Sequence, residues 1–231
     1  MRLIRVESTS SAFGLAAGLF MEAARAKPAA PIGLATGGTM EGIYSKLSEL
    51  SFKPDTKHAF ALDEYEGLRS DSPNSYAYEL NVKFVERLAW GGTLHVPGAG
   101  EYSGEAGLDL FEAEHQKLGP ISVQLLGLGS NGHVAFNEPG ADFDCLTRRV
   151  ELDPNTRRNN SRFFERLEDV PTHAFTQGLA TIRRASALIL VALGNKKLPA
   201  LTEALSSPSD NTPLAALLDH PDLTVVTDQN L

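Results

Sequence analysis

Short apolar runs alternate along the chain with segments whose apolar residues recur every three or four positions. The runs predict strands at residues 3–6, 32–35, 59–62, 94–96, 121–128, 187–193 and 223–226. The helical spacing predicts helices at residues 12–25, 40–50, 75–89, 104–118, 174–182 and 196–205. Strands that alternate with helices of about 10–15 residues are typical of βαβ units. We therefore predict an α/β fold, in which a Rossmann-like, mostly parallel sheet carries helices on both faces.

One long segment departs from this alternation. Residues 131–172 contain no clear strand, and several arginines lie there among carboxylates. A polar, charged excursion of this length inside an α/β domain is more often a functional lid than an idle loop. We place the lid at about residues 145–172. No linker divides the chain, so residues 1–231 are predicted to form a single domain.

Composition narrows the possible partners. The net charge of −8 argues against nucleic acid or an anionic membrane as the main partner, and no apolar run is long enough to span a membrane. Cys145 is the only cysteine, so no internal disulfide can form. The histidines are scattered, without the spacing of a zinc site, and we expect no metal.

The N-terminus raises one question of targeting. Arg2 and Arg5 precede an apolar run at 12–21, which loosely imitates a secretory signal. Glu7 interrupts the basic region, and two glycines thin the run. A first strand followed by a helix fits these residues better, and we expect a cytoplasmic protein.

The first candidate for chemistry is the turn Thr36-Gly37-Gly38-Thr39, between a predicted strand and a predicted helix. The glycines allow a tight turn with exposed N–H groups, the threonines add hydroxyl donors, and the helix directs its positive end at the same place. Together these groups suit a phosphate. No Gly-Lys-Ser/Thr follows, so a nucleoside triphosphate is not indicated. The alternative is a tight strand–helix connection without a ligand.

The second candidate is Asp63, which directly follows the predicted strand at 59–62. Ligands of open α/β sheets bind beyond the carboxyl ends of the strands, so a carboxylate here lies where chemistry takes place. The alternative is that Asp63 caps a turn or a helix.

The third candidate is the stretch 127–140, GLGSNGHVAFNEPG, which begins as G-x-G-x-x-G after an apolar run. A dinucleotide-binding turn needs a long helix after its last glycine, but Pro139 would stop any helix within two turns, which argues against NAD. His133 and Glu138 instead form a plausible acid–base pair, because a nearby carboxylate fixes the tautomer of a histidine. The alternative is a buried loop histidine that is held by the backbone.

Taken together, these stretches resemble the glucosamine-6-phosphate deaminase family, in order and over nearly the whole chain. The matching stretches are 34–39, 62–68, 73–76, 127–140, 160–164 and 194–197. The Asn-Gly-His and Phe-Asn-Glu-Pro block is specific to that family. The Thr-Gly-Gly-Thr turn is shared more widely, with 6-phosphogluconolactonases and ribose-phosphate isomerases among others.

The resemblance implies an enzyme that opens the ring of glucosamine 6-phosphate, isomerises it, and releases ammonia and fructose 6-phosphate without a cofactor. It implies that Asp63 moves a proton between C2 and C1, that His133 serves the ring oxygen, and that Glu138 supports His133. The residues that it assigns to the phosphate are Thr36, Gly37, Gly38, Thr39, Arg162 and Lys197.

Two positions depart from the longer members of the family. Asn131, counted here with the catalytic residues, stands where longer members carry Asp. Val150 stands where they carry a lysine of an allosteric site, although Arg148 matches an arginine of that site. We therefore expect no activation by N-acetylglucosamine 6-phosphate.

Three other functions stay open at this point. Two are enzymatic, a 6-phosphogluconolactonase and a galactosamine-6-phosphate isomerase, and the third is a sugar-phosphate sensor without catalysis. Retention of Asp63, His133 and Glu138 together argues against the sensor. The sequence does not decide between a monomer and a homo-oligomer.

Overall fold

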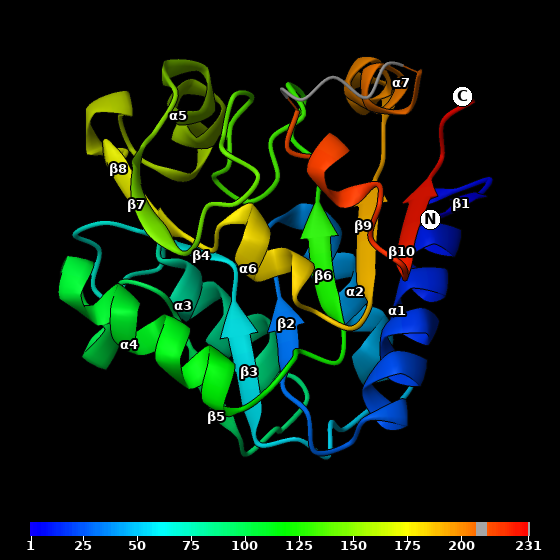
Figure 1. Cartoon of the computed structure of the whole chain (residues 1–231), viewed down its shortest axis with the longest axis horizontal. Coiled ribbons are helices and arrows are strands. Elements are labelled where there is room, and N and C mark those ends of the chain that lie inside the picture. The colour runs from blue at the N-terminus through cyan, green and yellow to red at the C-terminus, as the bar shows by residue number, and fades with distance from the viewer. Residues whose placement is uncertain (207–211, 231) are drawn as a thin grey trace.

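A seven-stranded parallel sheet runs through the centre of the computed structural model, which describes residues 1–206 and 212–230 (Figure 1). In spatial order its strands are β1 (Arg2–Arg5), β10 (Leu223–Thr227), β9 (Leu188–Ala192), β6 (Gln124–Gly127), β2 (Ile32–Leu34), β3 (His58–Ala61) and β5 (Thr93–His95). All neighbouring pairs run parallel. The predicted α/β architecture is confirmed, and each predicted strand is present.

Helices cover both faces of this sheet, as predicted; in Figure 1, α6 lies in front of it and α2 behind. The helices are α1 (Thr9–Ala26), α2 (Gly38–Glu49), α3 (Tyr76–Leu80), α4 (Gly104–Lys117), α5 (Pro154–Asn160), α6 (Leu179–Arg183) and α7 (Leu198–Ser206). The predicted helix at 75–89 is shorter and less regular, because α3 continues as a π-helix over Asn81–Glu86. Short 3₁₀ turns lie at Gly100–Tyr102, Ser161–Phe163, Leu167–Asp169, Asn195–Lys197 and Ala215–Leu217.

A second, antiparallel sheet corrects two expectations. Its strands, in the order β4 (Asp63–Tyr65), β8 (His173–Thr176) and β7 (Arg148–Glu151), include one strand inside the segment 131–172, where none was expected. The predicted helix at 174–182 is also wrong in its first half, which is β8. A Cβ on Gly178 would lie 2.1 Å from the Cys145 carbonyl oxygen, so the backbones approach too closely there for any other residue.

The small sheet is built onto the end of the large one. The chain leaves β3 and enters β4 through Leu62, whose N–H donates to the Leu34 carbonyl and whose carbonyl accepts from the Gln177 N–H. Figure 1 shows α5 and β7 beyond the carboxyl ends of the large sheet. The segment predicted as a lid therefore contains β7 and α5, and it lies over the edge where ligands of α/β proteins bind.

Candidate functional site

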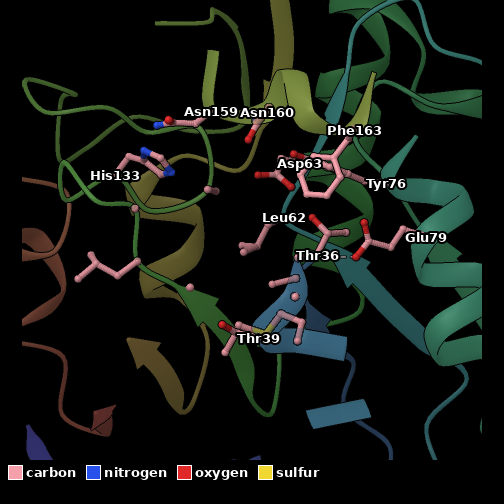
Figure 2. A pocket seen from close by; sticks show the side chains of 18 of the residues that line it. Thr36, Thr39, Leu62, Asp63, Tyr76, Glu79, His133, Asn159, Asn160 and Phe163 are labelled. Carbon is pink, nitrogen blue, oxygen red and sulfur yellow. Dashed lines mark hydrogen bonds between the residues drawn. The ribbon is translucent and has the colours of Figure 1, made fainter. Parts of the chain in front are cut away.

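A cavity of about 1030 Å³ opens at this edge of the sheet, and it brings together most of the predicted site residues (Figure 2). Eight of the predicted residues line it: Thr36, Gly37, Gly38, Thr39, Asp63, His133, Arg162 and Lys197. They come from segments far apart in the chain, which the parallel strands deliver to one side of the sheet. The other two predicted residues, Asn131 and Glu138, lie behind His133 and contact it.

The glycine turn presents backbone donors to this cavity. Gly37 has φ +104°, which favours glycine, and it precedes the first residue of α2 without any side-chain cap. The Gly37 N–H already donates to Glu79 Oε1 at 2.9 Å. Among the described residues, no acceptor contacts the N–H groups of Gly38 and Thr39. The turn thus offers an anion two amides at a helix N-terminus rather than three.

Two cations complete the positive end of the cavity. Lys197 lies in the 3₁₀ turn that follows β9, and Arg162 lies in the 3₁₀ turn that follows α5, with its guanidinium over the Phe163 ring. Burial lowers the pKa of Lys197, and the nearby charges of Arg162 and Lys196 lower it further. Both side chains line the same cavity, and an arginine and a lysine are the side chains that commonly bind phosphate.

Asp63 and its neighbour Glu64 have different tasks. Glu64 accepts hydrogen bonds from the N–H groups of Tyr65, Tyr76 and Ala77, so it caps the start of α3. Asp63 is 7% exposed, its carboxylate accepts no hydrogen bond from the described residues, and Figure 2 shows it facing the cavity. Burial raises the pKa of the Asp63 carboxyl well above its usual range, and the charges of Glu64 and Glu79 add to this. The alternative in which Asp63 caps a helix is therefore wrong, because Glu64 binds the N–H groups at the start of α3.

His133 is supported from behind by a chain of polar contacts. Glu138 Oε2 lies 3.6 Å from His133 Nδ1, too far for a hydrogen bond but close enough for an ion pair. Asn131 Nδ2 donates to the same Glu138 oxygen at 2.6 Å, and Thr156 Oγ1 donates to the other at 2.6 Å. Burial raises the pKa of Glu138, but the contacts with His133, Thr156 and Asn131 outweigh it and leave the pKa below its ordinary value.

This loop does not have the geometry of a dinucleotide turn. After Gly132 the backbone does not enter a helix; Val134 and Asn137 instead form an isolated antiparallel bridge. The N–H of Gly129 donates to the His133 carbonyl at 2.8 Å, which folds the loop back on itself. The glycines therefore shape a loop that presents His133, as the acid–base interpretation requires.

Thr156 was not predicted, and it connects the segment 145–172 to the loop 127–140 that carries His133 and Glu138. It lies on α5, within that segment, and its hydroxyl reaches Glu138. A second connection joins Asn160 Nδ2 to the Tyr65 hydroxyl at 2.8 Å. The sequence gives no sign that Thr156 belongs to the site, because its partner Glu138 lies 18 residues away and the hydrophobic pattern does not predict how the intervening segment folds. Arg148, in turn, donates to Asn137 Oδ1 at 2.8 Å.

Neither a metal cluster nor a membrane helix is found in the part of the chain that the structure describes. Within residues 1–206 and 212–230, no group of three His, Cys, Asp or Glu side chains is arranged to hold a metal ion. Over the same residues, no helix combines the length and the apolar character needed to cross a membrane.

Comparison with other sequences finds close relatives. A family model described as glucosamine-6-phosphate isomerases/6-phosphogluconolactonase matches residues 7–226. A glucosamine-6-phosphate deaminase from Listeria innocua serovar 6a is 43% identical over 203 residues, which cover 85% of this chain and 84% of the relative. One from Geobacillus sp. is 36% identical over an alignment of 236 positions that covers 100% of this chain and 94% of the relative.

Solved structures agree with the sequences. A monomeric glucosamine-6-phosphate deaminase superposes with a TM-score of 0.91 at 34% identity, over 99% of this chain and 98% of that one. A 6-phosphogluconolactonase from Shewanella baltica superposes with a TM-score of 0.75 at 19% identity, over 98% and 97% of the two chains. The second likeness shows a common fold and nothing more.

Proposed function

The chain belongs to the family of glucosamine-6-phosphate isomerases and 6-phosphogluconolactonases, and from this premise we propose that it converts glucosamine 6-phosphate to fructose 6-phosphate and ammonia. The observation that carries the proposal is the convergence of Asp63, His133 and the glycine turn on one cavity. An acid, an imidazole and an anion site together suit proton transfer on a phosphorylated sugar.

The phosphate group binds at the glycine turn. The free amides of Gly38 and Thr39 and the positive end of α2 hold it from one side. Arg162 and Lys197 hold it from the other. Because the whole chain carries a net charge of −8, this concentrated positive site is what draws an anionic substrate to the cavity.

The reaction then needs several proton transfers and one hydrolysis. His133 moves the proton between the anomeric hydroxyl and the ring oxygen, which opens the ring to the aldehyde. Asp63 removes the proton from C2 and delivers it to C1, while a proton passes from the amino nitrogen to the C1 oxygen, so the amino aldehyde becomes a ketimine with a C1 hydroxymethyl group. Water adds to C2 of the ketimine, the proton of the new C2 hydroxyl passes to nitrogen, and ammonia leaves with the electron pair of the C–N bond, which leaves the C2 carbonyl. The raised pKa of Asp63 makes it a stronger base for the second step.

Glu138 and Asn131 act through His133 rather than on the sugar. Neither lines the cavity, but both contact the His133 residue, and Glu138 lies on the Nδ1 side of the ring. A carboxylate at Nδ1 leaves Nε2 for the substrate and stabilises the imidazolium that forms. A cytoplasmic location is part of this proposal.

A coupled assay for ammonia and fructose 6-phosphate tests the proposed function directly. We expect purified protein to release ammonia from glucosamine 6-phosphate, and Asp63→Asn to lower kcat by about 10²–10⁴-fold, the usual contribution of an acid–base group. Binding of inorganic phosphate should survive the substitution, because Asp63 is not part of the turn. Binding without ammonia release in the wild-type protein would indicate a sensor. Faster turnover of galactosamine 6-phosphate or of 6-phosphogluconolactone would indicate one of the other two enzymes.

A further inference from the structure

Glu79 lines the same cavity, and the family resemblance gives it no role. It lies on α3, and Figure 2 shows its carboxylate directed at the Thr36 side chain, on the side of the cavity where Asp63 and Tyr76 lie. Its Oε1 accepts hydrogen bonds from the Gly37 N–H at 2.9 Å and from Lys83 Nζ at 3.2 Å. One carboxylate oxygen is therefore held in place by two donors, one of them a backbone amide of the glycine turn.

The second oxygen of the same carboxylate is available to a ligand. Across residues 1–206 and 212–230, no donor forms a hydrogen bond with Glu79 Oε2, and the side chain is 22% exposed. Lys83 also pairs with Glu41 Oε2 at 3.0 Å, so its charge is shared between two carboxylates. An ionised carboxylate can only accept hydrogen bonds, and hydroxyl groups are the donors that a sugar supplies.

Glu79 lines the cavity near both ends of the proposed substrate. Glu79 contacts the amide of Gly37, next to the free amides that suit the phosphate, and its charge is one of the causes that raise the pKa of Asp63. A hexose phosphate with its phosphate at the turn and its C2 at Asp63 extends along a cavity wall to which this carboxylate belongs. The groups that it carries along that stretch are hydroxyls.

We propose that Glu79 is a specificity-determining residue, whose free carboxylate oxygen accepts hydrogen bonds from the sugar hydroxyls between the reacting carbons and the phosphate. The inference rests on the proposed function for the orientation of the substrate. It adds a ligand preference that the glycine turn and Asp63 do not supply, namely for a polyhydroxylated phosphate ester over one without hydroxyls. Lys83 and Gly37 are then positioning groups, because they hold the carboxylate and do not touch the sugar.

Calorimetric titration with three ligands tests this proposal without using turnover. The ligands are D-glucitol 6-phosphate, which is an open-chain polyol, n-propyl phosphate, which has no hydroxyl groups on its chain, and inorganic phosphate. Glu79→Met removes the acceptor at similar length, and Glu79→Gln keeps one carbonyl acceptor. Glu86→Gln is the matched control, since Glu86 belongs to the same helical segment but does not line the cavity.

For Glu79→Met we expect the Kd of glucitol 6-phosphate to rise about tenfold or more, as for a lost hydrogen bond to a charged acceptor. The Kd values of propyl phosphate and inorganic phosphate should stay within about twofold or fall, because a negative charge near the turn is removed. Glu79→Gln should raise the Kd of glucitol 6-phosphate relative to that of propyl phosphate by a smaller factor than Glu79→Met does. Glu86→Gln should change none of the three Kd values.

Several results would overturn the proposal. An equal change for all three ligands would mean that Glu79 only shapes or charges the turn, and unchanged glucitol 6-phosphate binding would mean that it touches no hydroxyl. The proposal would also be overturned if glucitol 6-phosphate did not bind to the wild-type protein. Failure of the proposed function is a separate result, because it appears as absent ammonia release and leaves these binding ratios measurable.

Discussion

Gly129 lies against the His133 ring, and a single added methyl group at this position should disable that ring. A Cβ on Gly129 would lie 2.4 Å from both Nδ1 and Cε1 of His133, well under the 3.0 Å that real Cβ contacts keep. Backbone hydrogen bonds hold the loop itself, from the Gly129 N–H to the His133 carbonyl at 2.8 Å and from the Gly132 N–H to the Gly129 carbonyl at 3.2 Å. In Gly129→Ala the ring, and not the backbone, therefore moves.

The expected loss follows from what the ring contacts. A displaced imidazole loses its contact with Glu138 and no longer points into the cavity, so most of its contribution of about 10²–10⁴-fold to kcat should disappear. The side chain of His133 is 26% exposed, so moving it into solvent should lower the free energy of unfolding by less than about 1 kcal/mol. The glycine turn at 36–39, where we propose that phosphate binds, lies elsewhere in the cavity, so the affinity for inorganic phosphate should not change.

Steady-state kinetics of ammonia release, a thermal melt and a phosphate titration measure the three quantities. Gly127→Ala is the matched control, because the nearest heavy atom to its Cβ is Met40 Cε at 3.8 Å, an ordinary contact. If Gly129→Ala keeps the wild-type kcat, the orientation of His133 does not matter for the reaction and the role given to it is wrong. If phosphate binding or the melting temperature falls as steeply as kcat, the methyl group has disrupted the loop and the reasoning about the ring fails.

Two further substitutions probe the supports of the site. Thr156→Val removes one of the contacts that lower the pKa of Glu138, so the pKa of Glu138 should rise. The acid limb of the pH profile of kcat/KM should then move to higher pH. An unchanged profile would contradict the supporting role of Thr156. Glu112→Gln weakens a buried cluster in which Glu112 pairs with Arg184 at 2.8 Å and accepts from two threonine hydroxyls. We expect a loss of about 1–3 kcal/mol near pH 7 in denaturant unfolding. Burial raises the pKa of Glu112, but these contacts outweigh burial and lower the pKa below its ordinary value. The stabilisation that Glu112 provides is therefore present above the ordinary pKa and is lost as the pH falls through the folded-state pKa. If the difference in unfolding free energy between wild type and Glu112→Gln stays constant into acid, this assignment is refuted.

The large sheet could be predicted from the sequence because its strands are buried on both faces. Every residue of β9 (Leu188–Ala192) and β10 (Leu223–Thr227) is buried, and such strands read as continuous apolar runs. The small sheet left no such signal. β7 (Arg148–Glu151) alternates half-buried and exposed residues, and three of its four side chains are charged. Its pairing with β8 depends on the fold, and a pattern of that length is compatible with a loop.

Residues at the ends of parallel strands could be predicted as one site for the same reason. Once β2, β3 and β6 are recognised as parallel neighbours, their carboxyl ends must share one edge, so the glycine turn, Asp63 and His133 have to be near one another. The division of labour between Asp63 and Glu64 was not readable, because two adjacent acids look alike in sequence. Which of them meets the amides of α3 depends on the backbone that turns from β3 into β4.

Residues that helices bring to the cavity follow a different logic. The only local mark of Glu79 is Lys83 four residues later, a spacing that is common on exposed helix surfaces, where such pairs have little effect. What distinguishes Glu79 is the Gly37 N–H, 42 residues away, and that contact exists only because α3 packs beside the turn. Thr156 shows the same property, since α5 carries it to Glu138. The direction of the parallel strands places Asp63, His133 and the glycine turn at one edge of the sheet, whereas the packing of the helices determines which residues surround them. We therefore expect differences in substrate preference between relatives of the same fold to arise at helix positions that line the cavity, such as that of Glu79.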